Sequence, residues 1–189
     1  MRKRLLSFVL AVLMIASLLP ATALAADIVD SGTCGAEGDG SNLTWTLDSD
    51  GTLTISGSGD MYDYGFLSAP WYGSRSRVKS AVIADGVTSI GSSAFDDCTS
   101  LTSVTIPDSV TSIGHDAFYN CTSLTSVTIP NSVTSIGEDA FYRCDSLTGI
   151  WVNEGNNNYS SDASGVLFNK DKTTLVQCPG AFAAYTIPN

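Results

Sequence analysis

Few side chains in this 189-residue sequence could carry out catalysis. A nucleophilic triad needs a histidine beside a serine or cysteine, and the only histidine is His115. The sequence repeats every 23 residues here, and the equivalent positions hold Ser92 and Glu138, so we expect His115 at a variable surface position. Paired carboxylates such as Asp96-Asp97 also stand at variable positions, without a neighbour that would make one of them a general acid. We therefore predict no catalytic residue and no enzymatic activity.

The sequence also lacks a recognisable metal-binding pattern. Asp48-Ser49-Asp50-Gly51 resembles the start of a calcium loop, but the later ligands and the distal glutamate are missing. A hairpin turn explains these four residues. The five cysteines do not follow the paired C-x₂-C spacing of zinc sites. Cys98, Cys121 and Cys144 recur at one repeat position, where we expect small buried hydrophobic groups. Cys34 and Cys178 could form a disulfide or remain free. No metal and no cofactor are predicted.

The remaining candidate residues suit binding. Trp151 occupies a position that we expect to point outward from a strand. Its counterparts are Val82, Thr105 and Thr128. An exposed tryptophan among serines and threonines can anchor a sugar ring or a partner's side chain. Alternatively, a hairpin at 165–176 folds over Trp151 and buries it. The rest of the predicted binding face consists of Ser103, Thr105, Ser126, Thr128 and Asn153. Tyr119 and Tyr142 form a second candidate patch, or they shield the edge of the core.

The elements that position these residues belong to a repeat. Near-identical blocks of 23 residues begin at Val87, Val110 and Val133. A fixed period of this length indicates stacked coils, each of which buries its apolar face against its neighbours. Strand-like segments of the form L-x-x-V-x-I lie at 78–83, 101–106, 124–129 and 147–152. The Ile-Gly-x-x-Ala-Phe-x-x-Cys half of each block predicts a short helical turn. The fold prediction is an α/β solenoid, a leucine-rich repeat stack of 23-residue coils.

Two columns in this stack carry specific expectations. Phe95, Phe118 and Phe141 stand 23 residues apart. If the coils stack in register, the three rings become neighbours in one continuous core. A glycine also recurs in each block, at a place where we expect a backbone conformation that a Cβ would hinder. These glycines are Gly91, Gly114 and Gly137.

Outside the array, the sequence predicts different elements at each end. Residues 26–77 form an N-terminal β-rich cap, because two alternating runs at 43–47 and 52–55 meet at an Asp-Gly step that is typical of a hairpin. The array covers 78–155. Residues 156–189 contain an inserted hairpin, formed by 165–168 and 173–176, and then the start of a further, truncated coil.

The N-terminus and the charge bear on location and partners. Residues 1–25 have a basic start, a short apolar run and a small-residue end at Ala23-Leu24-Ala25, which predicts a signal peptide and therefore a secreted or cell-surface protein. No other apolar run is long enough to span a membrane. The net charge of −10 repels phosphate backbones, so nucleic acid is excluded as a partner.

Several stretches of the sequence resemble the BspA-like leucine-rich repeat family of secreted and surface proteins. The resemblance lies in the repeat unit at 78–155, in G-V-L-F-N-K-D-K-T-T-L at 165–175 and in T-W-T-L-D-S-D-G-T-L-T-I-S-G-S-G at 44–59. It implies a non-enzymatic binding or adhesion module that recognises a protein or glycan at a cell surface or matrix. The alternative is a structural spacer, a display fragment of a longer surface protein.

Overall fold

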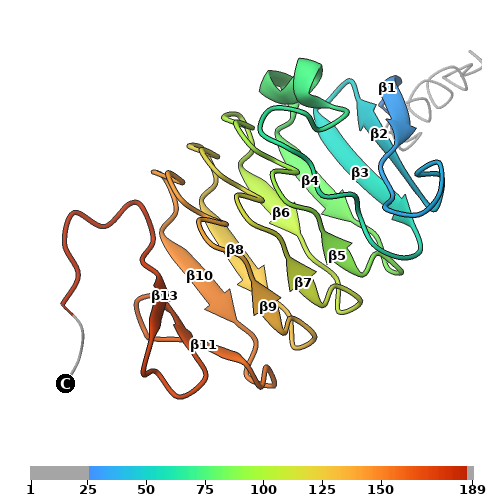
Figure 1. The fold of residues 1–189 in the computed structure, drawn as a ribbon. Helices are drawn as coiled ribbons and strands as arrows, with labels where there is room; N and C mark the ends of the chain where they lie inside the picture. Colours follow the sequence, from blue (N-terminus) through green and yellow to red (C-terminus); the bar gives the residue numbers. More distant parts are fainter. Residues whose placement is uncertain (1–25, 187–189) are drawn as a thin grey trace, which may run out of the picture.

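Each repeat folds into one turn of a solenoid, and the turns stack side by side (Figure 1). The structure is a computed structural model that describes residues 26–186, so the predicted signal peptide at 1–25 lies outside it. The strands form two arrays along the stack. We call them the long array and the short array. No helix within residues 26–186 has the length and apolar character that a membrane crossing requires.

The long array runs the whole length of the stack (Figure 1). Its strands are β1 (Ile28–Thr33), β2 (Leu43–Asp48), β3 (Thr52–Gly57), β4 (Ser80–Ile83), β6 (Ser103–Thr105), β8 (Ser126–Ile129) and β10 (Gly149–Val152). The first three pair antiparallel, whereas β3–β4–β6 and β8–β10 pair parallel, because each coil brings the chain back in the same direction. Between β6 and β8 the N–H of Thr125 donates to the carbonyl of Thr102 (3.3 Å), which links these two coils.

The short array contains two-residue strands from the three central coils. These are β5 (Ser89–Ile90), β7 (Ser112–Ile113) and β9 (Ser135–Ile136), all parallel. Their pairing places Ser89, Ser112 and Ser135 in one row, which confirms a 23-residue offset for these coils. The first parallel step of the long array is different, since Thr52 of β3 pairs with Ser80 of β4, 28 positions later. The coil length is therefore uniform only in the centre of the stack.

The α/β part of the fold prediction is wrong. The only helix in residues 26–186 is the short 3₁₀ helix η1 (Tyr72–Arg77), and the segments predicted as short helices are irregular turns. Each of these turns contains two residues with positive φ, a backbone conformation that interrupts a right-handed helix. They are Ser93 and Asp97, Asp116 and Asn120, and Asp139 and Arg143. The protein is thus a mostly β solenoid.

The predicted core columns are confirmed. The ring centroids of Phe95 and Phe118 are 5.0 Å apart and those of Phe118 and Phe141 5.5 Å apart, with 4° between the ring planes in both pairs. All three rings are buried. Trp71, from the start of η1, extends the aromatic column, with its centroid 5.7 Å from that of Phe95. The apolar side chains of successive coils thus form one continuous interior.

The recurrent glycines have a different role from the predicted one. Gly91, Gly114 and Gly137 do not adopt positive φ. A Cβ on Gly114 would instead lie 2.4 Å from the backbone nitrogen of Ser92, and a Cβ on Gly137 would lie 2.4 Å from that of His115. Glycine is needed because successive coils approach each other too closely for a side chain.

Hairpins close both ends of the stack. The first is confirmed, since β2 and β3 pair antiparallel with Trp45 opposite Ile55, and β3 then joins β4 directly. The second is β12 (Leu167–Asn169) with β13 (Leu175–Gln177), to which the structure adds β11 (Tyr159–Ser161) as a third strand. The N–H of Ile150 donates to the carbonyl of Gly165 (2.8 Å), so this sheet begins against the last coil. Leu167 of this sheet is buried in the core of the stack, and the partly buried Tyr159 and Val176 pack against that core.

Candidate functional site

The outward positions of the long array form the predicted binding face. Strand register places Ser80 beside Ser103, and Ser126 beside Gly149. A second row contains Val82 beside Thr105, and Thr128 beside Trp151. We call the following residues the strand face: Ser103, Thr105, Ser126, Thr128, Trp151 and Asn153. All six are exposed. The structure therefore brings the predicted residues to one surface.

The side chain of Trp151 is exposed and lies beside two glycines. It is 43% exposed, so the second hairpin does not bury it. A Cβ on Gly149 would lie 2.7 Å from the indole Nε1 and Cε2, and a Cβ on Gly165 would lie 3.2 Å from its Cζ2. The indole therefore lies along β10 over Gly149, with one edge beside Gly165. Two glycines, one on β10 and one before β12, leave the space that the indole occupies.

The sequence contains a signal for this arrangement, a pair of departures from the repeat. In the two preceding coils the strand reads Ser-Val-Thr, and in β10 it reads Gly-Ile-Trp. The serine-to-glycine change and the threonine-to-tryptophan change occur together, because the tryptophan ring needs the space that a serine Cβ would fill. Gly165 lies outside the repeat, and only the folded chain brings it to Trp151.

The hydroxyl groups near the strand face fall into two classes. Thr102, Thr125 and Thr148 stand just before the strands, and each donates its hydroxyl to a carbonyl of the preceding coil (2.9, 3.3 and 3.0 Å). The serine and threonine hydroxyls of the strand face take part in no hydrogen bond among residues 26–186; they belong to Ser103, Thr105, Ser126 and Thr128. These four groups remain available to a ligand.

The strand face is also electrically neutral. From β4 to β10 the outward positions carry Ser80, Val82 and the strand-face residues, none of which is charged. The chain as a whole has a net charge of −10. The face is therefore a neutral surface on an acidic protein.

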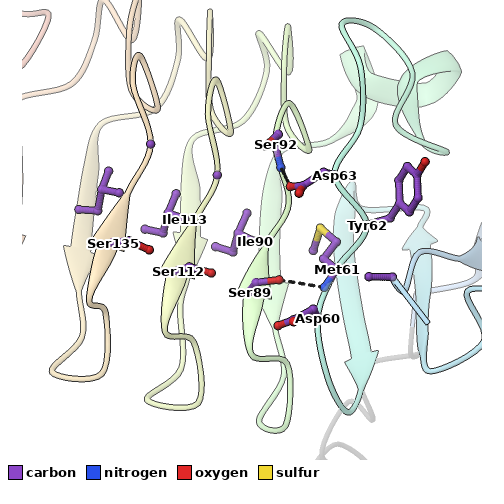
Figure 2. A pocket seen from close by; sticks show the side chains of 14 residues that line it. Asp60, Met61, Tyr62, Asp63, Ser89, Ile90, Ser92, Ser112, Ile113 and Ser135 are labelled. Atoms are coloured by element: carbon purple, nitrogen blue, oxygen red, sulfur yellow. Dashed lines mark hydrogen bonds between the residues drawn. The ribbon is translucent and has the colours of Figure 1, made fainter.

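A groove of about 610 Å³ runs along the short array on another side of the stack. Figure 2 shows Ser89, Ser112 and Ser135 in a row beside Ile90 and Ile113, with Asp60 and Asp63 at one end. No sequence pattern predicts this groove, because it depends on the segment at 59–64 lying against the first coil.

The polar groups at the end of the groove near Asp60 and Asp63 are already engaged in hydrogen bonds. Asp60 accepts a hydrogen bond from the hydroxyl of Thr88 (2.5 Å), and Asp63 accepts one from the N–H of Ser92 (2.7 Å). The Ser89 hydroxyl accepts the N–H of Met61 (3.1 Å). These contacts fasten segment 59–64 to the stack, so both carboxylates have a structural role there.

The second predicted patch lies on the turns between the arrays. The rings of Tyr119 and Tyr142 have centroids 5.7 Å apart, and Tyr142 is 49% exposed whereas Tyr119 is half-buried. A hydrogen bond with Tyr119 raises the pKa of Arg143. The repeat position of Tyr119 is occupied by Asp96 in the preceding coil. Burial raises the pKa of the Asp96 carboxyl group. The two tyrosines form a contacting pair, of which only Tyr142 presents much surface.

Most of the cysteines, which are candidate nucleophiles, lie buried in the core of the stack. Cys34, Cys98, Cys121 and Cys144, called the buried thiols below, are free and enclosed, and Cys178 is also free. Burial raises the pKa of Cys34, Cys98 and Cys144 to about 12, and that of Cys121 well above its ordinary value, which keeps these thiols protonated at neutral pH.

Two further observations concern the histidine and metal binding. The exposed His115 pairs with the adjacent Asp116 (2.8 Å). Within residues 26–186 no group of three or more His, Cys, Asp or Glu side chains is arranged to hold a metal ion.

Comparison with known proteins identifies the repeat. The family model of the BspA type leucine rich repeat region matches residues 71–177, in six copies. The chain belongs to the BspA-type leucine-rich repeat family. The match begins at Trp71 and ends at the last residue of β13, so the matched range includes the second hairpin. No curated protein matches this BspA-type chain.

Several solved bacterial structures are similar to this BspA-type chain. A leucine-rich repeat protein from Eubacterium ventriosum shares 31% identity over 84% of this chain and 54% of its own, with a TM-score of 0.49. The pneumococcal vaccine antigen PcpA shares 19% identity over 83% of this chain and 60% of its own, with a TM-score of 0.48. A leucine-rich repeat protein from Bacteroides capillosus shares 20% identity over 65% of this chain and 98% of its own, with a TM-score of 0.45. The chain thus spans just over half the length of the first two proteins.

Proposed function

We propose that this chain is a non-enzymatic binding module, secreted or displayed at a cell surface, that attaches to a protein or glycan of a cell surface or matrix. The strand face is the proposed contact surface. The observation that carries the proposal is Trp151, a large aromatic side chain that is 43% exposed on the last strand of the long array, beside the neutral hydroxyl groups of β8.

A physical argument supports this assignment. Binding energy at interfaces concentrates in a few aromatic anchors, with tryptophan among the most enriched. Immobilising a side chain on binding costs about 0.5–1.5 kcal/mol, and the indole of Trp151 is already confined by its position over Gly149. The side chain of Trp151 is therefore largely ordered before a ligand binds, so little binding free energy is spent on immobilising it. Tyr142 and Tyr119 are proposed as a secondary contact.

The proposal is tested by binding of the purified chain, from residue 26 onward, to an array of immobilised matrix proteins and glycans. Trp151→Ala is expected to lose binding while its circular dichroism spectrum and melting temperature stay unchanged. Phe66→Ala is the matched control, since it removes an aromatic ring that is 72% exposed and belongs neither to the strand face nor to the tyrosine pair.

The alternative function, a structural spacer that displays other parts of a longer surface protein, gains support if the unaltered chain binds nothing on the array. Retained binding by Trp151→Ala would instead show that the contact surface lies elsewhere. Export is a separate proposal, based on the leader sequence, and mass spectrometry of secreted protein that begins at Ala26 would support it.

A further inference from the structure

The strand face has a single large aromatic group and no continuous apolar surface. Apart from Trp151, the exposed large hydrophobic side chain on this face is Val82, on β4. It is separated from Trp151 by three strand spacings, which amounts to about 14 Å. Protein interfaces of ordinary size bury a more apolar core in which several anchors cluster. One ring at the end of a row of hydroxyl groups is a poor match for a protein partner.

The same features match a carbohydrate. The face of an indole ring carries partial negative charge, and the C–H groups on one face of a pyranose ring carry partial positive charge. A sugar ring can therefore stack on the exposed part of the indole. The hydroxyl groups around the edge of the sugar ring both donate and accept hydrogen bonds, as serine and threonine hydroxyls do. The unengaged hydroxyls of Thr128 and Ser126 lie on β8, the strand next to Trp151.

Electrostatics restricts the carbohydrate class. The outward positions from β4 to β10 carry no cationic side chain that could pair with a carboxylate or sulfate group. The net charge of −10 repels polyanions over distances comparable with the Debye length, about 10 Å at 0.1 M salt. Uronic-acid and sulfated polysaccharides are therefore disfavoured.

We propose that the ligand of the strand face is a neutral saccharide chain, with one sugar ring stacked on Trp151 and neighbouring sugars hydrogen-bonded to the hydroxyl rows of β8 and β6. This proposal rests on the proposed function, because it names the ligand class of the same surface. Strands about 4.8 Å apart present successive hydroxyl groups across the array. An extended chain that crosses the strands can use them in turn.

The three tryptophans provide a direct test. Trp45 and Trp71 are buried and Trp151 is the exposed one, so acrylamide quenching reports mainly on Trp151. The mature chain is titrated with three neutral polysaccharides, a β-glucan, a mannan and a xylan, and with heparin as the anionic comparison. We expect at least one neutral polysaccharide to protect the fluorescence from quenching, and heparin to have no effect at 0.1 M salt.

Variants separate stacking from a general effect on the fold. Trp151→Ala is expected to weaken binding by at least about tenfold, as loss of an aromatic anchor does, measured by affinity electrophoresis. Gly149→Ser introduces the residue of the preceding coils, whose Cβ would have three indole atoms of Trp151 as its nearest neighbours (2.7–2.8 Å). It is expected to displace the ring and weaken binding comparably, although the tryptophan is still present. Thr128→Val, which replaces a hydroxyl by a methyl group, is expected to lose severalfold.

The outcomes distinguish this proposal from the proposed function. Binding of a neutral polysaccharide that survives both Trp151→Ala and Gly149→Ser in folded protein overturns the saccharide proposal. Binding of heparin that is tighter than binding of every neutral polysaccharide also overturns the saccharide proposal. If no neutral polysaccharide binds but an immobilised matrix protein does, in a Trp151-dependent manner, the saccharide proposal is wrong and the binding function stands. If neither binds, both fail.

Discussion

Replacing Phe118 by alanine tests whether the stacked interior holds the protein together. The ring lies between those of Phe95 and Phe141, parallel to both, and is fully enclosed. Its coil is fixed on both sides by backbone hydrogen bonds. The N–H of Phe95 donates to the carbonyl of Ala117 (2.7 Å), and the N–H of Phe118 donates to that of Ala140 (2.8 Å). The neighbouring coils therefore cannot move in to fill the space that the ring leaves.

The expected loss follows from this rigidity. Truncating a buried phenylalanine to alanine costs about 3–5 kcal/mol, and the cost is higher where the site relaxes less. We expect the unfolding free energy to fall by about 4 kcal/mol, a large part of the roughly 5–15 kcal/mol that stabilises a typical domain. For a chain of this size, this corresponds to a decrease in the melting temperature of roughly 8–16 °C.

Urea unfolding at 25 °C, followed by circular dichroism and by tryptophan fluorescence, measures the effect. The two probes should give one transition if the stack unfolds as a unit, since Trp71 contacts Phe95 in the same column. Tyr142→Ala, an exposed change in the next coil, should cost less than about 1 kcal/mol. A Phe118→Ala loss no greater than that of Tyr142→Ala would refute the idea that the aromatic column carries the stability.

Three further predictions test other parts of the structure. Gly114→Ala places a Cβ 2.4 Å from the backbone nitrogen of Ser92, so we expect a loss of at least about 1–3 kcal/mol in thermal unfolding; an unchanged melting temperature would contradict the close approach of the coils. Asn156→Ala removes a buried amide that donates hydrogen bonds to two carbonyls (2.8 and 2.9 Å) and accepts them from two backbone N–H groups (both 2.8 Å). Urea unfolding should therefore show that the unfolding free energy falls by at least about 2 kcal/mol. Replacing the exposed Asn157 by alanine should change it very little. The buried thiols have raised pKa values in the folded protein, so the unfolded chain loses their protons first as the pH rises. The unfolding free energy should therefore be unaffected below about pH 8 and fall above about pH 9. Urea titrations at pH 8 and pH 10 under reducing conditions would detect this fall.

The repeat period was enough to predict most of the interior. Units such as 110–132 cannot bury their apolar side chains alone, so equivalent residues of neighbouring units have to meet. Phe118 therefore contacts Phe95 and Phe141 whatever the detailed path of the turns. The alternation around Asp48–Gly51 likewise predicted the first hairpin, because the period of two and the turn residues act locally.

The tertiary structure alone decided the path of the turns and the accessibility of the surface. Positive φ at Asp116 and Asn120 replaced the predicted helical turn by an irregular one, because the tight stacking of coils set the backbone conformation there. Trp151 is exposed because Gly149 and Gly165 make room for its ring, and these two residues are 16 positions apart in a part of the chain where the repeat is interrupted. Periodicity determines which residues face inward. The exposure of an outward side chain depends on non-repeating contacts, which the period does not encode.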